Sequence, residues 1–274
     1  MQTQSVATPG VSPHLESASE DLPVASPILL AWFTWYSRRY LRRHFHSLRV
    51  SRAGLPPRDS NAPLVIFVNH ASWWDPLLWI VLKAEFFPAR RAFAPIDSMA
   101  LARYKILSRL GFFGVEQKTG RGAIQFLRTA EKILRVPGQI LALTPQGRIA
   151  DSRERPVRFE PGLGYLATRA GNAVFLPVAS EFVFWEERLP EILVRFGAPI
   201  RTEQIGDAES ATLFFEHELE AVQDALAMEV KRRDPDDFQM IMRGGAGQGG
   251  VYDWYRATKA KILRETFLRE HGAR

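Results

Sequence analysis

His70 and Asp75 are separated by four residues and follow an apolar run, residues 63–68, with the length and β-branched content of a buried strand. A histidine that leaves the C-terminal end of such a strand lies where α/β proteins usually place active sites. If the chain turns there, the Asp75 carboxylate fixes one imidazole tautomer and stabilises the imidazolium, which makes His70 a general base. The chain has no cysteine and no Gly-x-Ser-x-Gly turn. We therefore expect the proton to come from a substrate hydroxyl.

The segment Asn69-His70-x-x-x-x-Asp75 resembles the signature of the glycerolipid acyltransferases, the PlsC-like superfamily that includes 1-acyl-sn-glycerol-3-phosphate acyltransferases. Ser72 inside the motif and Pro76 directly after it add to the resemblance. The resemblance implies that His70 and Asp75 are catalytic and that Asn69 and Ser72 contribute to substrate binding. It also implies transfer of an acyl group to an acceptor hydroxyl.

Residues 111–117 resemble the second sequence block of the same family. The family's usual Arg, which contacts the acceptor phosphate, is replaced here by Gln117 or, one place later, by Lys118. A phosphate needs a cation or several N–H donors. Lys118 is therefore the expected ligand, and the alternative is an ordinary surface lysine.

Residues 143–148 resemble the third block, which usually reads Phe-Pro-Glu-Gly-Thr-Arg. Here Gln146 replaces the Glu, Gly147 matches, and Arg148 comes one place early. Gln can form a hydrogen bond with a hydroxyl or a phosphate but cannot act as a carboxylate. We expect Gln146, Gly147 and Arg148 to bind the acceptor, with a selectivity that differs from the family's.

Residues 174–179 resemble the fourth block. A proline inside a strand normally marks an edge or a bulge, whereas the resemblance implies that Pro177 lines the acyl pocket. The similar segments together span about residues 48–200.

The composition favours a lipid surface as partner. Lys and Arg exceed Asp and Glu by six, and the chain has 18 Phe and 7 Trp. We expect anionic partners and, because of the aromatic residues, a membrane surface and no nucleic acid. No apolar run reaches the ~18 residues of a spanning helix, and the N-terminus does not resemble a signal peptide. No histidine has the spacing of a metal ligand, so we expect no metal site.

Residues 27–48 are expected to form an amphipathic helix. At about 100° per residue, Arg38, Arg39, Arg42 and Arg43 fall on one side, and leucines and aromatic residues, including Leu41 and Leu48, lie opposite. Such a helix is typical of proteins that lie in the interface of an anionic bilayer. It predicts peripheral attachment to the cytoplasmic face of the cell membrane. The alternative is a helix that packs on the core and leaves its Arg side in solvent.

The remaining chain alternates short strands with helices. This alternation of strands and helices is typical of an α/β fold with a mostly parallel central sheet flanked by helices. We expect a disordered tail over 1–26, a membrane-interface helix over 27–48, an acyltransferase domain over 49–205 and a C-terminal helical extension over 206–274. Within the extension, helices are expected over 208–233 and 251–271.

The residues and the resemblance together imply an O-acyltransferase of the 1-acylglycerol-3-phosphate acyltransferase type. The donor would be acyl-CoA or acyl carrier protein, the acceptor a lyso-phospholipid similar to lysophosphatidate, and no cofactor is expected. Two blocks lose their usual charged residue, which leaves open a non-phosphate acceptor such as an ornithine lipid precursor or a glycosylated isoprenoid. The intact His70–Asp75 pair argues against a non-catalytic membrane-binding relative.

Overall fold

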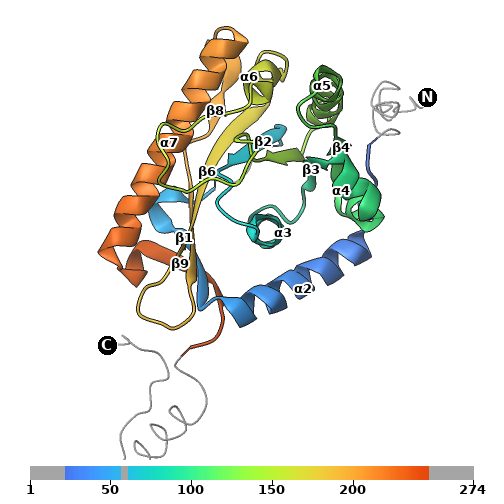
Figure 1. The fold of residues 1–274 in the computed structure, drawn as a ribbon. Coiled ribbons are helices and arrows are strands. Elements are labelled where there is room, and N and C mark those ends of the chain that lie inside the picture. The colour runs from blue at the N-terminus through green and yellow to red at the C-terminus, as the bar shows by residue number, and fades with distance from the viewer. Residues whose placement is uncertain (1–21, 57–60, 247–274) are drawn as a thin grey trace, which may run out of the picture.

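A nine-stranded sheet flanked by helices forms over residues 22–56 and 61–246, which the computed structural model describes (Figure 1). Eight strands follow the order β4-β3-β5-β2-β6-β7-β1-β9, and β8 pairs with β6. Five of the eight pairings are parallel and three are antiparallel. The predicted α/β fold with a mostly parallel sheet is therefore confirmed.

The strands are short, as the sequence pattern predicts. They are β1 (Ser47–Ser51), β2 (Leu64–Val68), β3 (Arg91–Asp97), β4 (Phe112–Val115), β5 (Gln139–Leu143), β6 (Val174–Val183), β7 (Glu191–Phe196), β8 (Ile200–Arg201) and β9 (Phe238–Arg243). The helices are α2 (Pro27–His44), α3 (Asp75–Phe86), α4 (Ser98–Arg103), α5 (Gly120–Leu134), α6 (Gly162–Ala167) and α7 (Ala208–Arg232). Four 3₁₀ segments, at 52–54, 105–110, 202–204 and 235–237, complete the described elements.

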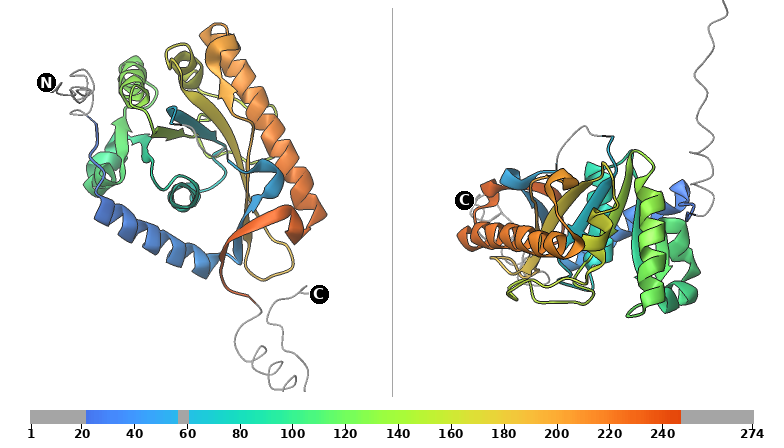
Figure 2. Two further views of the ribbon diagram at one scale, coloured as in Figure 1. Left: turned by 180° about the vertical axis from the view of Figure 1, so that it is seen from behind. Right: turned by 90° about the horizontal axis from the view of Figure 1, so that it is seen from above.

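Alternating side chains of β2 build a hydrophobic core on each face of the sheet. Val65 and Phe67 pack on the face covered by α5, α6 and α7. Leu64 and Ile66 pack on the face covered by α2 and α3. All four are nearly or fully buried, and each such side chain contributes about 1.5–3 kcal/mol of transfer free energy. The position of the β2 end, where His70 follows, is thus fixed from both faces (Figure 2).

Helix α2 packs against α3 through the side predicted to face a membrane. Leu41 is fully buried, and Leu48 lies in β1 because α2 ends at His44. The Arg38 guanidinium forms a 2.7 Å ion pair with Glu85 of α3. The alternative arrangement, with the apolar side on the core, is therefore the observed one. Within the described residues, no helix combines the length and apolarity needed to cross a bilayer.

A different side of α2 faces outward. We call it the outward stripe, and its residues are Ile28, Trp32, Trp35, Arg39, Arg42 and Arg43. Ile28, Trp32 and Trp35 are between 53% and 84% exposed, which is unusual for large apolar side chains. The stripe is apolar and aromatic in its N-terminal half and cationic in its C-terminal half.

The segment after residue 206 is only partly helical. Helix α7 forms where the sequence predicts it, with Asp207 accepting a 2.9 Å hydrogen bond from the Ser210 N–H as its N-cap. Strand β9 was not predicted, and it pairs antiparallel with β1 at the end of the sheet. Its apolar run shows no clear alternation, and its partner lies nearly 200 positions earlier in the chain. The predicted tail up to residue 21 and the predicted helix over 251–271 lie outside the described residues.

Candidate active site

The carboxyl ends of two neighbouring parallel strands position the predicted site. Strands β2 and β5 pair directly, with Phe67 opposite Leu143. The turns that follow them, residues 69–74 and 144–150, therefore leave the sheet at the same edge. The Ala150 N–H donates a 2.8 Å hydrogen bond to the His70 carbonyl and so joins the two turns.

His70 and Asp75 are in direct contact. Asp75 Oδ2 lies 2.7 Å from His70 Nδ1 and also accepts a 3.0 Å hydrogen bond from the Ser72 N–H. The contact assigns the ring proton to Nδ1, which leaves Nε2 as the proton acceptor. Asp75 is the first residue of α3, where the helix dipole favours a carboxylate. The pair can therefore act as an oriented general base.

Burial separates the roles of the two side chains. The Asp75 side chain is 7% exposed, whereas that of His70 is 24% exposed. Asp75 Oδ1 is buried and has no hydrogen-bond partner among the residues that the structure describes. The Asp75 carboxylate lies beside His70 in a site with little water. There it stabilises an imidazolium more strongly than a carboxylate in bulk water would. The more exposed His70 ring is therefore accessible from solvent, and the buried Asp75 carboxylate holds its orientation.

Asn69 anchors the turn of residues 69–74 to the neighbouring strand β6. Its side-chain amide accepts from the Ser180 N–H at 2.8 Å and donates to the Ser180 carbonyl at 3.0 Å. Asn69 is 1% exposed, so the predicted contact with substrate does not fit, and the side chain positions the turn instead. Ser72 also shapes the turn, because its backbone N–H donates to Asp75 and its Oγ accepts from the Trp74 N–H.

Gln146 binds the turn of residues 69–74, which carries His70 and which we call the catalytic turn. Its Oε1 accepts a 2.9 Å hydrogen bond from the His70 backbone N–H. Gly147, next in the chain, has φ +65°, a conformation that favours glycine, and a Cβ there would lie 2.9 Å from Glu160. The sharp turn at Gly147 thus places Gln146 against His70. The departure from the family's Glu falls on a residue that positions the base.

We expect Gln146→Met to lower kcat by about tenfold. The variant leaves the His70 N–H without its acceptor, and such a loss costs about 1–3 kcal/mol. Gln146→Glu should keep most activity because a carboxylate accepts the same hydrogen bond. The measurement is steady-state kinetics with varied acceptor, with exposed Gln125→Met on α5 as the matched control. A rise in acceptor KM with kcat unchanged would show instead that Gln146 contacts the acceptor.

The predicted cations lie at the periphery. The Arg148 side chain is 57% exposed and forms an ion pair with Glu154. Lys118 is exposed, with φ 57°, and follows β4. Strand β4 is three strand positions from β2, roughly 14 Å at ~4.8 Å per step. The structure therefore brings Arg148 beside the catalytic turn but does not bring Lys118 to His70.

Pro177 is buried in the sheet, in the strand next to the one that ends at the predicted site. It pairs with Phe67 in register, and its carbonyl accepts a 2.8 Å hydrogen bond from the Gly197 N–H. A Cβ on Gly197 would meet Pro177 and Val222 of α7. Pro177 therefore packs near α7, and the acyl-pocket role implied by the resemblance stays a prediction.

Two features of the site escaped the sequence reasoning. Trp74 packs its ring at 5.0 Å from Phe45, 5.6 Å from Tyr40 and 5.1 Å from His44, all ring centroids, and so joins α2 to the catalytic turn. The two adjacent tryptophans inside the motif, Trp73 and Trp74, were the signal in the sequence.

The second feature is Glu181, the residue after Ser180. Burial raises the pKa of its carboxyl group, and the positive charges of Arg153 and Arg155 lower it.

Two of the three comparisons with known proteins found matches. The profile of the family described as Acyltransferase matches residues 42–181, more than half of the 274-residue chain and the part that contains His70, Asp75 and Gln146. The comparison with curated proteins found no match.

Among solved structures, the chain is similar to the 1-acyl-sn-glycerophosphate (LPA) acyltransferase PlsC from Thermotoga maritima. The sequence identity is 16%, the TM-score is 0.51, and the match covers 75% of this chain and 81% of that one. At this identity the likeness shows a shared fold. The family match covers more than half of the chain and shows that this chain belongs to the acyltransferase family, and the likeness to PlsC shows that the two share a fold.

Proposed function

We propose that this protein transfers a fatty acyl group from acyl-CoA or acyl carrier protein to the hydroxyl of a lyso-phospholipid similar to lysophosphatidate. The observation that carries the proposal is the 2.7 Å contact between His70 Nδ1 and buried Asp75. It leaves Nε2 of a half-buried imidazole as the base at the carboxyl edge of the sheet, where the acceptor hydroxyl would bind.

The proposed reaction follows from that geometry. His70 Nε2 takes the hydroxyl proton as the hydroxyl oxygen forms a bond to the thioester carbonyl carbon. The carbon–sulfur bond then breaks, and the imidazolium returns the proton to the sulfur, so an ester and a thiol are the products. Asp75 stabilises the imidazolium between these steps. No cofactor is needed, because the thioester is already an activated acyl group.

The proposal that the acceptor is a phosphate ester rests on Arg148. A bidentate Arg contact is a strong way to hold a phosphate, and Arg148 lies two residues from Gln146. The test is incubation of the purified protein with labelled acyl-CoA and a panel of lyso-lipids. The expected result is labelled product with lysophosphatidate and little with neutral acceptors.

A non-phosphate acceptor is the second candidate, and two observations favour it. Arg148 already has Glu154 as an ion-pair partner, and Gln146 is bound to the His70 backbone. The same panel therefore includes an ornithine lipid precursor and a glycosylated isoprenoid. Product with one of these and none with lysophosphatidate would establish this second acceptor class and reject the first.

We also propose that the outward stripe of α2 binds an anionic membrane surface, which supports peripheral attachment at the cytoplasmic face. Tryptophans and basic residues side by side on one exposed face are typical of interfacial helices. Trp73, 66% exposed in the catalytic turn, adds an aromatic residue close to the site. The Trp74 contacts link this helix to the turn, so a bound membrane would lie near His70.

We expect Arg39→Ser, Arg42→Ser and Arg43→Ser together to release the protein from anionic vesicles. Each basic residue near such a surface contributes roughly 1 kcal/mol. Arg38→Ser is the matched control, because Arg38 pairs with Glu85 and lies off the stripe. Co-sedimentation with vesicles measures the effect. Equal losses for the control and the triple variant would count against the stripe.

A further inference from the structure

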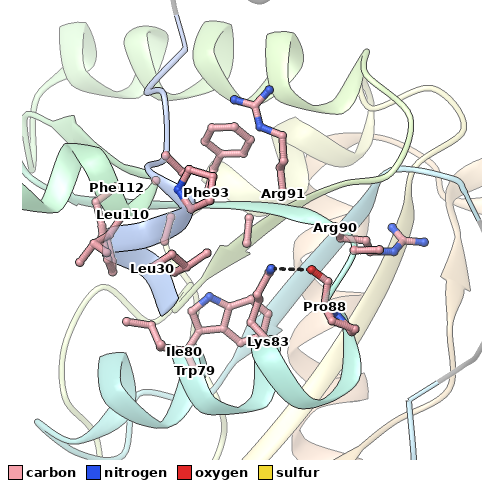
Figure 3. A pocket seen from close by; sticks show the side chains of 16 residues that line it. Leu30, Trp79, Ile80, Lys83, Pro88, Arg90, Arg91, Phe93, Leu110 and Phe112 are labelled. Carbon is pink, nitrogen blue, oxygen red and sulfur yellow. Dashed lines mark hydrogen bonds between the residues drawn. The ribbon is translucent and has the colours of Figure 1, made fainter. Parts of the chain in front are cut away.

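A pocket of about 240 Å³ (Figure 3) lies at the edge of the sheet opposite to the proposed acyl-transfer site. It is lined by the starts of β3 and β4, the middle and end of α3, and the start of α2. His70 follows the carboxyl end of β2, whereas these β3 and β4 residues are at the amino ends of strands parallel to it. No residue of the catalytic turn lines the pocket.

The lining combines apolar walls with positive charge. Leu30, Trp79, Phe93 and Phe112 are among its apolar residues, and Lys83, Arg90 and Arg91 are its charged ones. No acidic residue lines it among the described residues. In Figure 3 Leu30, Leu110 and Phe112 lie toward one end, and Lys83, Pro88 and Arg90 toward the other. Lys83 and Arg90 therefore give one end of the pocket positive charge, whereas Arg91 lies over the Phe93 ring.

Lys83 is the unusual group in this pocket. It is 8% exposed, although lysines are almost never buried without a partner. Its Nζ donates one hydrogen bond, of 3.2 Å, to the Pro88 carbonyl, while an ammonium has three donors. Burial lowers the pKa of Lys83. The described residues thus offer Lys83 one neutral acceptor and no counter-charge.

The complement of this pocket is a ligand with a negatively charged head and an apolar body. A carboxylate would accept the remaining Lys83 donors, and an alkyl chain would cover the aromatic and aliphatic wall. The volume lies below the about 300–1,000 Å³ usual for drug-sized ligands, which suits one chain of medium length. A neutral thioester chain would leave the ammonium without a counter-charge.

We propose that this pocket is a second lipid site, which binds a single-chain fatty carboxylate through Lys83. The site does not depend on the proposed acyl transfer, because it shares no residue with the His70–Asp75 pair. It includes the start of α2, and α2 contacts the catalytic turn through Trp74.

The test is calorimetric titration of the full chain with decanoate and with decanol, both below the concentrations at which they aggregate. The wild type should bind decanoate more tightly than decanol. Lys83→Met should weaken decanoate binding by about tenfold or more, the effect of losing a charge-assisted hydrogen bond, and leave decanol binding unchanged. Lys231→Met, an exposed lysine on α7, is the matched control and should change neither.

Two further variants keep the outcome decisive. Ala94→Phe fills the pocket and should block decanoate and decanol alike without touching Lys83. His70→Ala should bind decanoate as the wild type does. Equal affinity for the two ligands, or equal effects of Lys83→Met and Lys231→Met, would overturn the proposal. Loss of decanoate binding in His70→Ala would place the carboxylate at the acyl-transfer site instead.

Discussion

Replacing His70 with Ala should lower kcat/KM for acyl transfer by about 10²–10⁴-fold, the usual effect of removing a general base. The ring is 24% exposed and does not belong to the hydrophobic core clusters of the described residues, so the fold should stay intact. The variant lacks the imidazole that we propose takes the proton from the acceptor hydroxyl. Labelled acyl-CoA with a saturating lyso-lipid measures the effect.

The matched control for this prediction is His217→Ala, which removes an exposed histidine from α7. Its turnover should equal that of the wild type. Circular dichroism and unfolding midpoints establish that both variants fold. If folded His70→Ala kept wild-type turnover, the base would be another group.

Asp75→Asn should lower kcat by about 10²-fold or more, with a smaller effect on KM. The Asn side-chain oxygen can still accept hydrogen bonds from the His70 ring and from the Ser72 N–H, because both donors bond to Oδ2 of Asp75. The amide nitrogen would then occupy the Oδ1 position, which has no partner among the described residues. The variant thus keeps the geometry and loses the charge that stabilises the imidazolium.

Asp236→Asn, at an exposed carboxylate far from the site, is the control. The double variant of His70→Ala with Asp75→Asn separates the roles further. Because Asp75 acts through His70, the double variant should be no slower than His70→Ala alone. Multiplied losses would mean that Asp75 has a catalytic function of its own.

The sequence was sufficient for the parts of the fold that depend on local pattern. An apolar, β-branched run predicted β2, and the residues after it predicted the His70–Asp75 contact that the structure contains. The strand-helix alternation predicted the mostly parallel sheet. These inferences succeed because strand periodicity and the location of sites at strand ends are local properties.

Other roles depended on contacts between distant segments. Asn69 and Gln146 were predicted to bind substrate. In the structure the Asn69 amide bonds the backbone of Ser180, 111 positions away, and the Gln146 amide bonds the backbone of His70, 76 positions away. Sequence shows that an amide is present and does not show which distant backbone group meets it. Lys118 was expected at the site, and the sheet order separates it from His70.

Helix α2 shows a related limit of periodicity. The pattern identified an amphipathic helix, but it could not decide whether the apolar side meets lipid or protein, since both are apolar. The structure packs that side on α3 and leaves the outward stripe exposed.

Acyl transfer by the His70–Asp75 pair can be tested by following both products of the reaction at once. Purified protein is mixed with labelled acyl-CoA and lysophosphatidate, and both the esterified label and the released thiol are followed in time. Ester and thiol should appear together in equal amounts with the wild type, and both should be lost with His70→Ala. Ester formation at the same rate in the folded His70→Ala variant would contradict acyl transfer by this pair.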